Sequence, residues 1–122
     1  MFGFGESSHQ QVYGDQHEGK FSHELIAGAA SFEAARIFEN RQRSEGKPVS
    51  HAFAKELLAG IAGGEVDKLV ETKGLDYLDR DQARAQAQRS VQENYDSHYG
   101  QQDQWSPDQQ PPFDYQDNKY NY

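Results

Sequence analysis

The apolar residues of the chain are concentrated in two similar segments, which begin 32 residues apart. The segment "ELIAGAASFEAARIFE" (24–39) is followed by "ELLAGIAGGEVDKLVE" (56–71). In both, apolar residues recur at intervals of three and four, as on one face of an α-helix. The repeat units span about 21–40 and 53–73, and two copies are too few for a solenoid. They predict a close-packed antiparallel helical hairpin with approximate two-fold symmetry.

The residues that flank the two segments are typical of helix ends. Ser22 and Ser50 are placed to cap the two N-termini with their hydroxyl groups. Gly46 and Pro48 end the first helix before the second begins. Gly74 stands where a left-handed C-terminal cap of the second helix belongs.

A third and more polar helix is predicted from about residue 79 to residue 97. Asp79 with Gln82 resembles a capping box that has aspartate at the cap position. The apolar stripe of this helix is narrow and has i+4 spacing: Ala83, Ala87, Val91 and Tyr95. The predicted fold class is therefore all-α, a small helical bundle built on the hairpin with this third helix added.

Each repeat helix has apolar positions on two sides. Phe32 lies outside the main apolar arc of the first helix, and Phe53, Leu57 and Ile61 lie outside the arc of the second. A two-helix hairpin covers only one side of each helix. The other side needs the third helix, the N-terminal arm or another copy of the protein.

The two ends of the chain have the composition of unfolded polypeptide. Residues 1–20 contain few apolar anchors, and we expect a flexible N-terminal arm. Residues 99–122 are rich in Gln, Asp, Tyr and Pro, and we expect a disordered tail. Its spaced aromatic side chains, Trp105 among them, offer the alternative of weak association. The helical domain is then residues 21–98.

Composition and charge argue against several kinds of partner. The chain has 122 residues with a net charge of -8, whereas nucleic acids and anionic membranes select basic surfaces. There is no cysteine, which excludes disulfides, thiolate metal sites and a cysteine nucleophile. The hydrophobic content of 34% is low, so part of the chain must supply the whole core.

The sequence predicts a cytoplasmic protein without a transmembrane segment. The start "MFGFGESSHQ" lacks the basic and apolar regions of a signal peptide. The longest mainly apolar run, Leu57–Gly64, is far shorter than the ~20 residues that span a bilayer. The absence of cysteine also fits a reducing compartment.

Small residues are unusually frequent in both repeat helices. They are Ala27, Gly28, Ala30 and Ser31 in the first, and Ala59, Gly60, Ala62, Gly63 and Gly64 in the second. Because glycine costs about 1 kcal/mol relative to alanine inside a helix, close packing of backbones must offset it. We interpret these positions as a helix-packing or interaction face within the chain. Packing between subunits and contact with lipid are the alternatives.

No combination of residues predicts catalysis, a metal site or a cofactor. Paired glutamates could hold two metal ions in a bundle, but the residues three positions after Glu33 and Glu65 are Arg36 and Lys68 rather than histidine. We expect ion pairs between Glu33 and Arg36 and between Glu65 and Lys68. No histidine pair has i+4 spacing, and no nucleophile elbow or phosphate-binding loop is present.

The chain resembles the fungal CipC-like family, named after concanamycin-induced protein C, from about His9 to Tyr99. The segments that carry the resemblance are "HQQVYG", "KFSHELIAGAASFEAARIFE", "GKPVSHAFAKELLAGIAGGEVDKLVETKGLD" and "YDSHY". It implies a small intracellular protein whose abundance rises under antibiotic or other stress. The family has no defined catalytic residues, so the resemblance supplies none.

Two functional hypotheses follow. The first is a non-enzymatic stress-response protein that acts by self-association or by binding an unknown protein partner. It rests on the apolar positions on two sides of each repeat helix. The second is a small-molecule or lipid-surface binder, which would use the small-residue face of the second helix.

Overall fold

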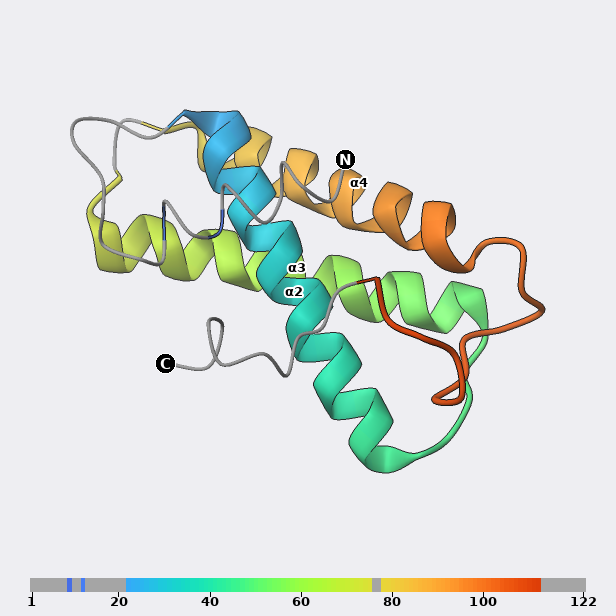
Figure 1. The fold of residues 1–122 in the computed structure, drawn as a ribbon. Coiled ribbons are helices and arrows are strands. Elements are labelled where there is room, and N and C mark those ends of the chain that lie inside the picture. Colours follow the sequence, from blue (N-terminus) through green and yellow to red (C-terminus); the bar gives the residue numbers. More distant parts are fainter. Residues whose placement is uncertain (1–8, 10–11, 13–21, 76–77, 113–122) are drawn as a thin grey trace.

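The structure is a computed structural model that describes His9, Val12 and residues 22–75 and 78–112. Its helices, labelled as in Figure 1, are α2 (His23–Glu45), α3 (His51–Lys73) and α4 (Arg80–Tyr99). No β-strand is found in these residues, so the all-α prediction is confirmed.

The three helices pack around one core, each in contact with the other two. In Figure 1, α3 and α4 run in opposite directions, and α2 crosses in front of them. The expected hairpin of the first two helices is not confirmed in this arrangement. The third helix is instead a full member of the bundle, and α2 contacts both other helices.

The N-terminal caps have the predicted residues. The Ser22 and Ser50 hydroxyls accept hydrogen bonds from the amides of Leu25 and Phe53, each at 3.1 Å. The Asp79 carboxylate accepts from the Gln82 amide at 3.2 Å. Each cap satisfies an amide that the first turn of a helix leaves without an intrahelical partner.

Two glycines end the first two helices in the left-handed conformation. Gly46 has φ of 73° and Gly74 has φ of 66°, which glycine adopts without steric cost. Because Gly46 is the stop signal, α2 continues to Glu45 rather than ending near residue 40. This additional turn places Gln42 and Arg43 next to the C-terminal residues.

The core contains the predicted apolar stripes. Ile26, Ala30 and Phe38 of α2 are at most 1% exposed. The stripe of α4 is buried along its whole length, and Tyr99 continues it. Burial of these faces supplies the main driving force for folding, about 25 cal/mol for each Å² of apolar surface.

One side of α3 stays open. Phe53 is 48% exposed, and Leu57 and Ile61 are only partly buried. With Gly60 and Glu56 these residues line a shallow groove on the surface. We call Phe53, Leu57, Gly60, Ile61 and Gly64 the α3 strip.

The prediction of a disordered tail from residue 99 is wrong for residues 99–112. Tyr99 ends α4, and Trp105 is fully buried against the helices. The indole is the only tryptophan of the chain, and its burial ties the surrounding polar residues to the bundle. We call residues 101–112 the strap. The other expected tail residues, 113–122, and the N-terminal arm apart from His9 and Val12 lie outside the described residues.

Within the described part of the chain, none of the helices combines the length and the apolarity that crossing a membrane requires.

Candidate functional site

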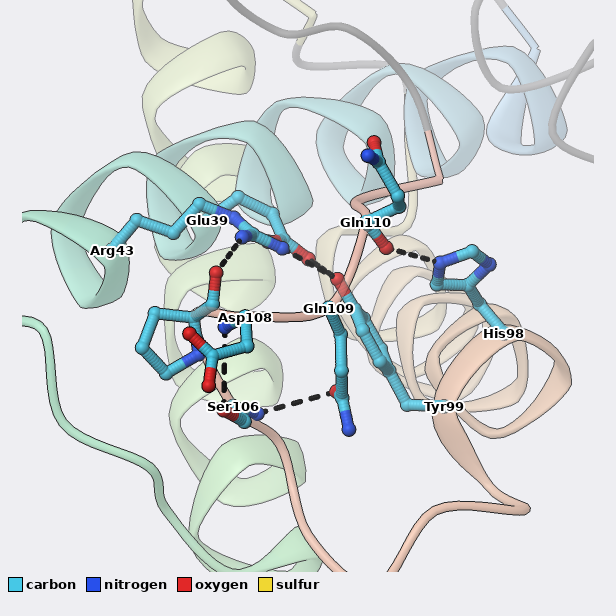
Figure 2. A network of polar contacts seen from close by, with 9 residues as sticks. Glu39, Arg43, His98, Tyr99, Ser106, Asp108, Gln109 and Gln110 are labelled. Atoms are coloured by element: carbon cyan, nitrogen blue, oxygen red, sulfur yellow. Dashed lines mark hydrogen bonds and ion pairs between the residues drawn. The ribbon is translucent and has the colours of Figure 1, made fainter.

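A buried carboxylate lies at the centre of a polar cluster between α2, α4 and the strap (Figure 2). Glu39 is 3% exposed. Its Oε1 accepts from Nε of Arg43 at 2.8 Å, and its Oε2 accepts from the Tyr99 hydroxyl at 2.6 Å. Arg43 also donates to the Tyr99 hydroxyl at 3.2 Å. The charge of Glu39 is therefore paired inside the protein, as a buried charge requires.

Burial raises the pKa of the Glu39 carboxyl above its usual value, and the interactions with Tyr99 and Arg43 offset only part of this rise. Burial also raises the pKa of the Tyr99 hydroxyl, and the neighbouring charge of Glu39 adds to the effect. Tyr99 therefore stays protonated and acts as a hydrogen-bond donor to Glu39.

Trp105 lies over the same cluster. Its ring packs edge-on against Phe38, with the centroids 5.4 Å apart, and the Arg43 guanidinium carbon is 5.2 Å from its centroid. The indole nitrogen is buried without a partner in hydrogen-bonding geometry. Proximity of this N–H group lowers the pKa values of Glu39 and Tyr99 slightly, which places it beside them.

Two histidines connect the helices to the strap. The His51 side chain contacts the Tyr95 hydroxyl through Nδ1 and the Gln102 carbonyl through Nε2, both at 2.6 Å. A carbonyl can only accept, so Nε2 donates and Nδ1 of neutral His51 accepts from Tyr95. His98 likewise donates from Nε2 to the Gln110 carbonyl at 2.6 Å (Figure 2). These side chains stabilise the position of the strap.

A second polar cluster lies on another side of α2. Glu33 accepts from Nε of Arg36 at 3.0 Å, and its Oε1 is 2.8 Å from Nε2 of His9. Glu33 and Arg36 are thus in contact, as the sequence analysis expected. Burial by itself would raise the pKa of Glu33, but His9 and Arg36 together lower it to about 2.

The Glu33 cluster predicts a change in stability with acid pH. Because the pKa falls from 4.5 to about 2 on folding, its contribution is complete above 4.5 and is lost as pH falls toward 2. Replacement by glutamine (Glu33→Gln) should cost about 1–2 kcal/mol at pH 7, allowing for solvent screening. Urea denaturation at pH 7 and pH 3 measures this. The deficit of the variant should shrink at pH 3, and an unchanged deficit would contradict the assignment.

Glu65 and Lys68 are not joined by any ion pair among those identified in the described residues. Glu65 is 8% exposed and has other interactions, whereas Lys68 is exposed. The i,i+3 spacing permitted the pair, but the two side chains have different environments.

The small residues divide into two groups. Ala27, Gly28, Ala30 and Ser31 of α2 are all buried, and the Ser31 hydroxyl donates to the Gly28 carbonyl at 3.0 Å. In α3, only Ala62 and Gly63 of the predicted set are buried. Ala59 is partly buried, and Gly60 and Gly64 are exposed.

The glycines of α3 show which partner is close. A Cβ atom on Gly63 would lie 2.9 Å from Nε2 of Gln88, so this glycine permits the close approach of α4. A Cβ on Gly60 or Gly64 would meet nothing within 4 Å. The packing of this chain therefore does not account for Gly60 and Gly64, which are costly residues in a helix interior.

A small apolar cavity lies beside the Glu39 cluster. Its lining includes Phe32, Phe38, Leu58 and Val91, and Pro112 of the strap covers part of it. Its volume, measured as the space open to the centre of a water molecule, is about 20 Å³. That is room for about one water molecule, so a larger ligand would have to displace the strap.

The described residues contain no group of three or more His, Asp or Glu side chains arranged to bind a metal ion. The polar clusters consist of ion pairs and of hydrogen bonds to tyrosine and to main-chain carbonyls. Such an arrangement can hold chain segments together and can bind a partner.

Sequence reasoning missed Glu39, Arg43 and Trp105 as a unit. Glu39 corresponds to Glu71 in the repeat, and Glu71 is exposed. The available signal was the single tryptophan, because a large aromatic residue in a polar stretch is costly to leave in water.

The sequence was compared with protein families, with curated proteins and with solved structures. The family model described as "Virulence factor CipC-like" matches residues 8–98. No curated protein and no solved structure gives a significant match. The matched residues include the three helices except Tyr99, and they end before the strap.

Proposed function

Since the chain belongs to the Virulence factor CipC-like family, whose description gives no mechanism, we propose that it is a non-catalytic, stress-associated protein that acts by self-association. The single observation that carries this proposal is the α3 strip. It combines an exposed phenylalanine with two exposed glycines that the chain's own packing does not use. Solvent-exposed apolar side chains beside a flat glycine surface favour contact with another helix.

Charge supports a second copy of the chain as the partner. In an antiparallel pair of α3 helices centred on Ala62, Gly60 of one copy faces the partner's Gly64. In the same register Glu56 faces the partner's Lys68, and both side chains are exposed. Two-fold symmetry repeats each contact, giving two glycine contacts and two ion pairs in a self-complementary interface.

The oligomeric state tests this proposal. Size-exclusion chromatography with light scattering should show a concentration-dependent dimer. Gly60→Leu should weaken the dimer about tenfold or more, because the added side chain separates the helices by more than its apolar area gains. The monomer should keep its fold, since a side chain at this position points into open space.

A charge exchange gives the matched control. Glu56→Lys should weaken the dimer through like-charge repulsion, and the double variant Glu56→Lys with Lys68→Glu should restore it. A wild-type protein that stays monomeric at high micromolar concentration would rule out the proposal. Restoration that fails while the dimer persists would reject the antiparallel register.

The apolar cavity favours a second candidate function, the binding of a small apolar molecule. Its walls are mainly apolar, and Glu39, Asn94 and Tyr95 supply polar atoms. A thermal-shift screen of small apolar compounds would show stabilisation by ligands that replace Pro112. Liposome co-sedimentation distinguishes this from a lipid surface bound through the α3 strip, where Phe53→Ser should abolish pelleting.

A further inference from the structure

The helices hold the strap through its main chain. Val49 and Trp105 exchange both main-chain hydrogen bonds, each at 3.0 Å, in an isolated antiparallel bridge. Arg43 donates from Nη1 to the Pro107 carbonyl at 2.8 Å. Contacts of this kind do not depend on the side chains of the strap, and receptors that bind peptides by strand addition use the same pattern.

The histidines extend this main-chain recognition to both ends of the strap. His51 donates to the Gln102 carbonyl and His98 to the Gln110 carbonyl. Between these ends, Trp105 is the only strap residue that is fully buried. Several main-chain contacts together with one aromatic anchor are how a groove binds an extended peptide.

The groove and its occupant belong to different parts of the chain. Arg43, Val49, His51 and His98 lie within residues 8–98, which match the family model, whereas the strap lies beyond them. The groove is therefore built by the family domain, and the segment that fills it follows that domain. The residues between Gly100 and Trp105 are all exposed, so they connect the two parts without being buried themselves.

We propose that the groove between the C-terminal ends of α2 and α4 and Val49 is a peptide-binding site, and that the strap of a second copy of the chain can enter it in place of the chain's own. Every contact described above can form between copies as well as within one. The covalent connection only raises the local concentration of the chain's own strap. Exchange of an identical segment in this way is a low-cost route to association.

The test uses the full chain, cut after it has folded. A recognition sequence for a specific protease is inserted between Gln102 and Asp103, both exposed. Cleavage leaves the helical body and a fragment from Asp103 to Tyr122. Size-exclusion chromatography should show the fragment eluting with the body. Native mass spectrometry of a mixture of ¹⁵N-labelled and unlabelled cleaved chains should then show hybrids, in which a labelled body holds an unlabelled fragment.

A competition experiment supplies the control without changing the protein. A synthetic peptide of residues 103–112 should displace the fragment, and the same peptide with Trp105→Ala should displace it at least about tenfold less well. Loss of the fragment on cleavage would overturn the proposal. A fragment that stays bound without forming hybrids and without displacement by peptide would overturn it as well, because the strap would then be a fixed part of the core.

Discussion

Replacement of Trp105 by alanine is expected to lower the free energy of unfolding by about 3–5 kcal/mol, the range for truncating a large buried aromatic residue. The indole is 0% exposed and packs on Phe38 and under Arg43. Its loss leaves a cavity beside a buried ion pair. The strap should then detach, because Trp105 is its only fully buried side chain.

Urea denaturation followed by circular dichroism measures this effect, since Trp105→Ala removes the only tryptophan fluorophore. Phe53→Ala is the matched control, an aromatic residue that is 48% exposed. It should change the unfolding free energy by less than about 1 kcal/mol. A loss of similar size in both variants would show that the strap is not part of the stable fold.

Arg43→Met is expected to cost about 3–5 kcal/mol at neutral pH, because it leaves the carboxylate of Glu39 buried without its cation. Methionine keeps much of the aliphatic volume of arginine, so lost packing makes a small contribution. The variant also removes the hydrogen bonds to Tyr99 and to the Pro107 carbonyl. Lys55→Met, which removes an exposed ion pair with Asp96, should cost about 1 kcal/mol or less.

The pH dependence separates a buried charge from lost contacts. Burial raises the pKa of Glu39 above the usual 4.5, so the folded protein takes up this proton at higher pH than the unfolded chain does. The contribution of Glu39 to stability therefore falls as pH rises through this interval. Without Arg43 the pKa rises further and the interval extends upward.

Denaturation of Arg43→Met and wild type should therefore be compared at pH 8 and at pH 4.5. The deficit of the variant should be largest at pH 8 and smaller at pH 4.5, where Glu39 is protonated in the variant. A deficit of equal size at both values would mean that Glu39 carries no uncompensated charge. The hydrogen bonds of Arg43 would then account for the whole effect.

The helices of this chain could be predicted because their causes are local. Ser22, Ser50 and Asp79 cap the helices as expected, and their hydrogen bonds reach only three residues along the chain. Gly74 adopts the left-handed conformation expected of it. The end of α2 is at Glu45, further on than predicted, because the sequence contains no stop signal before Gly46.

The internal repeat predicted two helices but did not predict their environments. Gly28 and Glu39 of α2 are buried, whereas the equivalent Gly60 and Glu71 of α3 are exposed. The reason is position in the bundle. The face of α2 that carries Glu39 is covered by α4 and the strap, while α3 has an open side.

The sequence by itself determined the all-α class, the caps, the apolar stripes and the family. These depend on residues close together in the chain and on a long matching string. Only the tertiary structure decided that Trp105 belongs to the core, that Glu39 and Arg43 form a buried pair with Tyr99, and that Gly60 and Gly64 face outward. These features join residues distant in sequence or depend on which neighbours cover a helix face, and helical periodicity specifies a face without specifying what covers it.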